Sequence, residues 1–249
     1  MKRLLKPVFQ SIVTKKEILL FLSCAFYPLL IALVSLFQAG IADYVEGQPM
    51  SFITFWQLIV QTQWQLTIPT LLLSYGVMSV FSNDILSKRL FLFKDIERPL
   101  IFKVKVYNLL KILMLFIAGT FVTTLACYYT FMLPRDFIAG HLFPETYPLL
   151  INSLLAILSC IAVYMIVILL VANLTIRYNV VVSVLGGVLF MLFSNIAPQL
   201  TFGKFLFPNG YTELGNSAII SLAGIVMISG SYCFLFYWLG IRAFERVEY

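Results

Sequence analysis

Charged side chains are scarce in this sequence. They make up 11% of the 249 residues, while 61% are hydrophobic and the mean hydropathy is +0.96. A soluble domain typically has about 25% charged residues to cover its water-facing surface, so an ordinary soluble domain is excluded. The apolar residues form long runs rather than the short alternating strands of a membrane β-barrel. Because about 20 helical residues cross a bilayer core, the runs predict an all-α polytopic membrane protein.

The motifs of several enzyme chemistries are also missing. The chain has one histidine, His141, and neither a His-Glu-x-x-His nor a Gly-x-Ser-x-Gly motif, which argues against a metalloenzyme or a serine hydrolase. It has no Gly-x-x-x-x-Gly-Lys-Ser/Thr loop for a nucleotide. The cysteines lie singly in apolar runs and indicate neither disulfides nor a metal site. We expect no catalytic residue, metal or cofactor in this chain. The cysteines are Cys24, Cys127, Cys160 and Cys233.

Ionisable residues are nearly absent from the expected spans. Ion-coupled transporters and proton pumps usually place a carboxylate or a histidine at mid-membrane depth. Any energy for transport is therefore expected to come from outside this chain.

The apolar runs predict a single transmembrane domain over residues 1–249, with about six spans. Residues 2–14 repeat apolar side chains at helical spacing, which predicts an amphipathic helix on the membrane surface. Pro28 predicts a kink in the first span. The second is longer than one crossing needs, so it tilts, bends near Pro69 or projects from the membrane. The predicted spans are about 18–38, 55–82, 106–132, 149–173, 180–197 and 216–240.

The lysines and arginines predict the orientation. With the N-terminus inside, fifteen of the seventeen lie on the cytoplasmic side, and only Arg135 and Lys204 lie on the other. Cytoplasmic loops carry such an excess of cations, so both termini are predicted to be cytoplasmic. The net charge of +6 then indicates the membrane surface rather than nucleic acid.

The segment 83–105 joins the second and third predicted spans. It alternates acidic and basic residues around an apolar cluster at 90–93, and Pro99 is expected to end a short helix there. Two interpretations are open. The phenyl rings dip into lipid while the cations meet anionic headgroups, or the segment is a docking helix with aromatic anchors and a charged rim.

Three glutamines lie on one face of the second span, at positions 57, 61 and 65, with Trp64 nearby. Amides facing lipid are costly unless they are paired. Gln57, Gln61 and Gln65 therefore form hydrogen bonds between subunits, line a substrate path, or lie at a water-exposed outer end of the helix.

The connection 198–215 is unusually apolar for an external loop. Its aromatic residues are expected either to form an interfacial aromatic belt or to belong to a re-entrant hairpin, which needs protein or water around its backbone. They are Phe202, Phe205, Phe207 and Tyr211.

In layout, the whole chain resembles the membrane subunits of ABC-2 type transporters, especially the short permeases of lantibiotic and antibiotic-peptide immunity exporters. The shared features are a basic surface helix, six spans, a long cytoplasmic loop after the second span and an apolar excursion before the last. The segment 84–105 is the most specific part of this resemblance. The resemblance implies a type V exporter-like fold in the bacterial cytoplasmic membrane. It also implies that the aromatic residues of 198–215 close the outer end of the pathway.

The resemblance further implies partners. ABC ATPase subunits on a separate polypeptide would hold ATP and Mg, and a second permease subunit, identical or homologous, would complete the pathway. The substrate would be amphipathic or hydrophobic, for example an antibiotic peptide leaving the membrane or cytoplasm. A non-transporting scaffold or sensor-partner subunit is the alternative. The ATPase-coupling residues implied are Asp84, Lys88, Arg89, Phe91, Phe93, Lys94, Asp95, Glu97 and Arg98.

Overall fold

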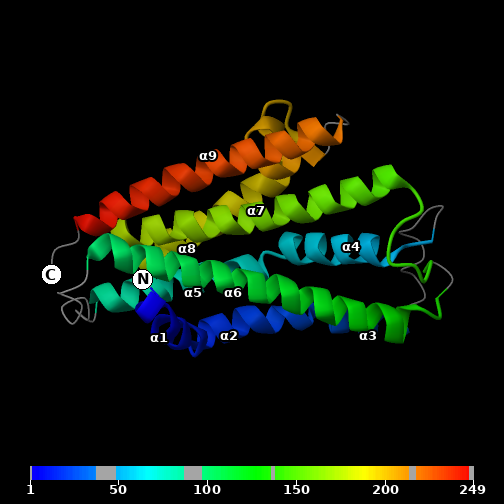
Figure 1. Ribbon diagram of the computed structural model, residues 1–249, viewed down its shortest axis with the longest axis horizontal. Helices are drawn as coiled ribbons and strands as arrows, with labels where there is room; N and C mark the ends of the chain where they lie inside the picture. The colour runs from blue at the N-terminus through cyan, green and yellow to red at the C-terminus, as the bar shows by residue number, and fades with distance from the viewer. Residues whose placement is uncertain (1, 38–48, 87–96, 136–137, 213–216, 247–249) are drawn as a thin grey trace.

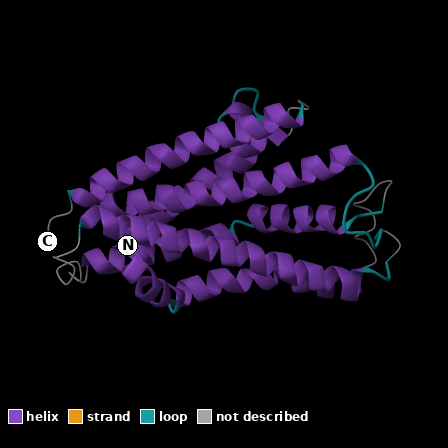
Figure 2. Cartoon of the chain, viewed as in Figure 1, coloured by secondary structure: helices purple, strands orange, loops and turns teal. Residues whose placement is uncertain are grey.

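The computed structural model describes residues 2–37, 49–86, 97–135, 138–212 and 217–246. Within these ranges the chain forms helices joined by turns, and no strand (Figure 2). The α-helices are α1 (Lys2–Val13), α2 (Lys16–Ser23), α3 (Tyr27–Phe37), α4 (Phe52–Gln65), α5 (Ile68–Leu86), α6 (Arg98–Cys127), α7 (Tyr147–Arg177), α8 (Val180–Ile196) and α9 (Ala218–Glu245). Shorter helical turns are η1 (Cys24–Phe26), η4 (Tyr128–Met132), η5 (Ala197–Gln199), η6 (Gly203–Phe205) and η7 (Pro208–Thr212).

The number of possible spans agrees with the sequence. Five stretches of the described chain are long and apolar enough to cross a membrane, and α4 with α5 makes a sixth if the bent pair counts as one span. The prediction of an α-helical membrane protein with about six spans is confirmed at this level. The five are Lys16–Val34, Arg98–Met132, Tyr147–Arg177, Val180–Gln199 and Ala218–Glu245.

The long helices lie side by side, with α7 at the centre and α9 along one edge (Figure 1). In the most apolar stretch of α7, 72% of the residues are buried, against 11% in α9. Helix α7 packs against α4, α5, α6, α8 and α9. The face of α9 directed away from α7 is therefore left for lipid or another subunit.

The first span is broken where Pro28 removes a backbone donor. Without an N–H at residue 28, the carbonyl of Cys24 lacks its i+4 helical partner and accepts instead from the Tyr27 N–H in the turn η1. The Gln63 side chain of α4 donates to that carbonyl at 2.9 Å, and the Thr123 hydroxyl of α6 donates to the next one, of Ala25, at 2.6 Å. Side chains of two neighbouring helices thus donate to backbone carbonyls at the predicted kink, inside an apolar span.

The second span is broken between α4 and α5, whose axes differ by 63°. The bend predicted near Pro69 is found, but the residue that makes it is Thr67, whose φ of 56° lies in the left-handed region. Pro69 is the second residue of α5, where its missing N–H costs no helical bond. Pro99 likewise lies in the first turn of α6, and the short helix predicted before it lies outside the described residues.

One end of the bundle contains α1, the beginning of α6 and the end of α9 (Figure 1). We call it the basic end. There α1 packs on α6, and Asn108 of α6 donates to the Leu5 carbonyl at 3.2 Å. Lys15 and Lys105 both donate to α5, at the carbonyls of Ser79 (2.6 Å) and Val80 (2.9 Å). The end of α5 is thereby tied to α2 and α6.

At the opposite end, the segment before α7 closes the start of α4. The first N–H groups of α4, those of Phe52 and Ile53, donate to the carbonyls of His141 and Leu142 at 3.0 and 3.2 Å. The Tyr128 hydroxyl donates to the Met50 carbonyl at 2.9 Å. These bonds satisfy helix-terminal donors that would otherwise lack partners.

Candidate functional site

A polar pocket lies inside the bundle where α4 faces α7 and the end of α8. Its volume is about 160 Å³, room for a few water molecules. Three of the lining side chains come from α4, the helix that carries the glutamines. Several others come from the apolar connection before α9. The lining residues are Gln61, Trp64, Gln65, Ser159, Cys160, Asn195, Pro198, Gln199, Asn209 and Thr212.

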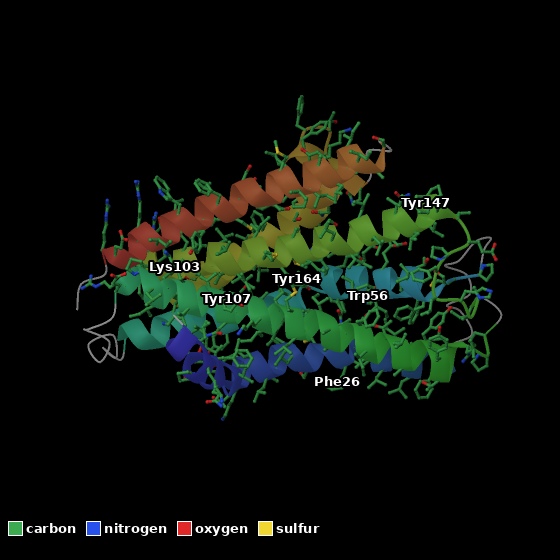
Figure 3. All side chains as sticks on the ribbon, viewed as in Figure 1. Phe26, Trp56, Lys103, Tyr107, Tyr147 and Tyr164 are labelled. Atoms are coloured by element: carbon green, nitrogen blue, oxygen red, sulfur yellow. The ribbon has the colours of Figure 1, made fainter. Side chains whose placement is uncertain are left out.

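The pocket lies near the middle of the long span α7. Gly187 of α8 packs on Val171 of α7, and the two helices are antiparallel. Nine residues further along α8, its last residue Ile196 is therefore level with about residue 162, the midpoint of α7. Figure 3 shows the labelled Tyr164 of α7 in the same central part of the bundle. The connection that follows α8, residues 197–212 in the described part, therefore starts inside the bundle rather than beyond its end.

Asn209 holds this connection against α8. Its amide donates to the Ser194 carbonyl, and its side-chain oxygen accepts from the Ser194 hydroxyl at 2.8 Å. Asn209 is 7% exposed, so the two bonds satisfy a buried amide. They hold the described part, 197–212, as a compact turn against α7 and α9. Residues 213–215 of the predicted connection lie outside the described ranges.

The glutamines separate into different roles. Gln61 and Gln65 line the pocket with Trp64, whereas Gln57 only reaches Gln61, at 3.4 Å along the same helix. Gln63, which is off the predicted face, is the buried donor to the first span. Glutamines of one helix therefore have two roles, lining the pocket and bonding to the backbone of the first span. Their spacing in the sequence does not tell the two roles apart.

The four aromatic residues predicted as a gate or belt do not line the pocket. Phe202 is 85% exposed. The Phe207 ring packs on Phe190 of α8, with centroids 5.2 Å apart. The Tyr211 ring lies against Gly224 of α9, where any Cβ would overlap it, and its hydroxyl donates to the Phe205 carbonyl at 3.1 Å. The polar residues of the connection, rather than its aromatic ones, face the pocket.

Several buried polar atoms around the pocket and along α7 lack a partner among the described residues. They include Nε1 of Trp64 on α4, the hydroxyl of Ser74 on α5, and the Asn173 side-chain oxygen on α7. Buried polar atoms are ordinarily paired with protein or ordered water. The interior between α4, α5 and α7 thus has hydrogen-bonding groups that are unpaired among the described residues, at several positions along the bundle axis.

The predicted coupling segment is only partly described. Six of its residues, Lys88, Arg89, Phe91, Phe93, Lys94 and Asp95, lie outside the described ranges, and Asp84 is placed only as backbone in the last turn of α5. Glu97 immediately precedes α6. Arg98 donates to the Glu245 carbonyl at the end of α9, at 2.9 Å. In the sequence, the segment joins the end of α5 to Arg98, which contacts the end of α9.

Comparison with known proteins gives no relative. No family model matches the chain, and neither curated proteins nor solved structures give a significant match.

Proposed function

We propose that this chain is the membrane-spanning permease subunit of an ATP-driven exporter of the ABC-2 type. It works with ABC ATPase subunits that hold ATP and Mg, and with a second permease subunit, in a bacterial cytoplasmic membrane. The observation that carries the proposal is the mid-span polar pocket between a broken span and an excursion that begins inside the bundle. Broken helices and irregular backbone at membrane depth occur where they line a cavity.

The pocket chemistry supports an amphipathic substrate. Its described lining offers amides, hydroxyls, a thiol and an indole, without a carboxylate or an amine. Such groups form hydrogen bonds to a peptide without having to neutralise a buried charge. The described lining has no carboxylate or histidine of the kind that ion-coupled transporters use, which is consistent with energy supplied by a partner ATPase.

The helix connections support a mechanical route to the pocket. The end of α5 is held by Lys15 and Lys105, and α4 and α5 meet at the strained residue Thr67. A displacement of the 84–98 segment by an ATPase moves α5 together with α2 and α6. The change in angle is absorbed at residue 67, as expected of a hinge, and alters the wall formed by Gln61 and Gln65.

The test removes the pocket amides. Gln61→Leu combined with Asn195→Leu should slow the ATP-driven uptake of a labelled cationic amphipathic peptide by inverted membrane vesicles, by about tenfold for about 1.4 kcal/mol of lost interaction. Gln57→Leu is the matched control, because Gln57 lies on the same helix outside the pocket. Wild-type uptake in the double variant would contradict a role for the pocket. A non-transporting scaffold predicts no ATP-dependent uptake in any of the three proteins.

A further inference from the structure

Three arginines surround a pocket at the basic end, remote from the polar pocket. It lies between the last turn of α7 and the last turns of α9 and has a volume of about 560 Å³. Arg177 ends α7, and Arg242 and Arg246 lie one turn apart at the end of α9. The other lining residues are Ile176, Leu239 and Ala243.

Two of the guanidinium groups are held in place by neighbouring groups. Arg177 donates through Nη2 to the Leu239 carbonyl at 3.3 Å. The guanidinium of Arg242 lies 3.6 Å from the centre of the Trp238 ring, which is close enough for a cation–π interaction. Both contacts orient the side chains at the rim of the pocket.

Stabilisation of helix ends accounts for only part of this arrangement. Cations near a helix C-terminus are favourable, and Arg177 spans from α7 to a carbonyl of α9. A guanidinium has five N–H donors, however, and this bond uses one. Within the described part of the chain, no carboxylate forms an ion pair with Arg177, Arg242 or Arg246, so three positive charges face one pocket with unused donors.

Below the arginines, the surface becomes apolar and exposed. Leu235, Leu239, Arg242 and Arg246 recur at spacings of four, three and four residues, so they share one face of α9. Leu235 is 44% exposed, and α9 is the least enclosed of the apolar helices. A ligand held at the arginines therefore has an apolar, lipid-facing strip directly beneath its charged group.

We infer that this pocket binds the phosphate of an anionic phospholipid in the leaflet at the basic end. Planar guanidinium groups bind phosphate oxygens through paired N–H donors, and basic pockets between spans recognise anionic headgroups. The strip that includes Leu235 contacts the acyl chains. The bound lipid joins the ends of α7 and α9, the two helices between which the pocket opens.

The experiment measures lipid binding by native mass spectrometry of the full chain purified in mild detergent. Wild type should bind phosphatidylglycerol about tenfold or more tightly than phosphatidylcholine with the same acyl chains. Arg242→Gln with Arg246→Gln should lose this preference, while Arg242→Lys with Arg246→Lys should recover part of it, because it keeps the charges but not the paired N–H donors. Failure of the lysine pair to recover binding would overturn the inference, because it would point to a loss of structure rather than of charge.

The matched control is Lys16→Gln with Lys103→Gln, two exposed cations of the basic end outside the pocket. This control should keep the preference for phosphatidylglycerol. An equal loss in both glutamine pairs would overturn the inference, since it would reflect total charge rather than the pocket. Excess inorganic phosphate should leave the lipid bound, and its displacement by phosphate would instead indicate a site for a free anion.

Discussion

At the residue scale, Gln63 shows how a polar side chain is used inside an apolar bundle. Pro28 removes the i+4 donor to the Cys24 carbonyl, which accepts instead from the Tyr27 N–H and, at 2.9 Å, from the Gln63 amide. The kink was predictable from Pro28 alone. That Gln63 donates to this carbonyl was not predictable, because Gln63 is thirty-nine residues away in the sequence, on another helix. Gln63 differs from the three neighbouring glutamines only in the direction that packing gives its side chain.

Gln63→Leu should destabilise the protein by about 1 kcal/mol, because it removes an interhelical hydrogen bond to the Cys24 carbonyl, which then keeps only the Tyr27 N–H as a donor among the described residues. Thermal unfolding of the detergent-purified protein measures this loss. Gln57→Leu is the control and should have a smaller effect, because its amide bonds only to Gln61 on the same helix surface. Adding Pro28→Ala restores an N–H for the Cys24 carbonyl and should recover part of the loss. Equal stability of the two leucine variants would contradict this role for Gln63.

At the element scale, the sequence located the helices better than their breaks. Long apolar runs identify a span whatever its neighbours are, so the presence of five or six helices able to cross a membrane was predictable. The break of the second span was placed near Pro69, whereas the backbone turns at Thr67, for which the sequence carries no turn signal. A β-branched residue rarely adopts positive φ, so the residue type at position 67 gave no indication of the break.

Thr67→Gly should raise the unfolding temperature, because glycine adopts positive φ without strain and about 1 kcal/mol is recovered. Thr62→Gly is the control, because Thr62 has ordinary helical backbone in the last turn of α4, and it should lower stability by about 1 kcal/mol. Differential scanning fluorimetry of the two purified variants compares them directly. If Thr67→Gly were destabilised as much as Thr62→Gly, residue 67 would not be a strained hinge.

At the scale of the whole molecule, the glutamines of α4 and the connection before α9 meet in one pocket. Either feature could be noticed in the sequence, and both were interpreted as possible parts of a path. Their proximity could not be predicted, because it depends on α8 ending level with the middle of α7. The polar residues Asn195, Gln199, Asn209 and Thr212 were missed, because the aromatic residues around them dominate the sequence pattern.

The coupling segment gives a prediction at the same scale. Phe91→Ala with Phe93→Ala should release the partner ATPase from the purified complex, because aromatic anchors contribute most of the binding energy of such contacts. Phe202→Ala is the control, since it removes an exposed phenyl ring of the connection before α9. Quantitative mass spectrometry of the ATPase retained on the tagged chain provides the measurement. Retention equal to wild type in the double variant would contradict docking at these residues.

The most direct test of the permease proposal is to purify the tagged chain from its own membranes into lipid nanodiscs. Mass measurement and assay of ATP hydrolysis on that one sample decide the question. The proposal predicts a complex that contains two permease subunits and ABC ATPase subunits, and that hydrolyses ATP. A chain that purifies without any ATPase, and shows no ATP hydrolysis, would contradict the proposal and leave a membrane protein with a different purpose.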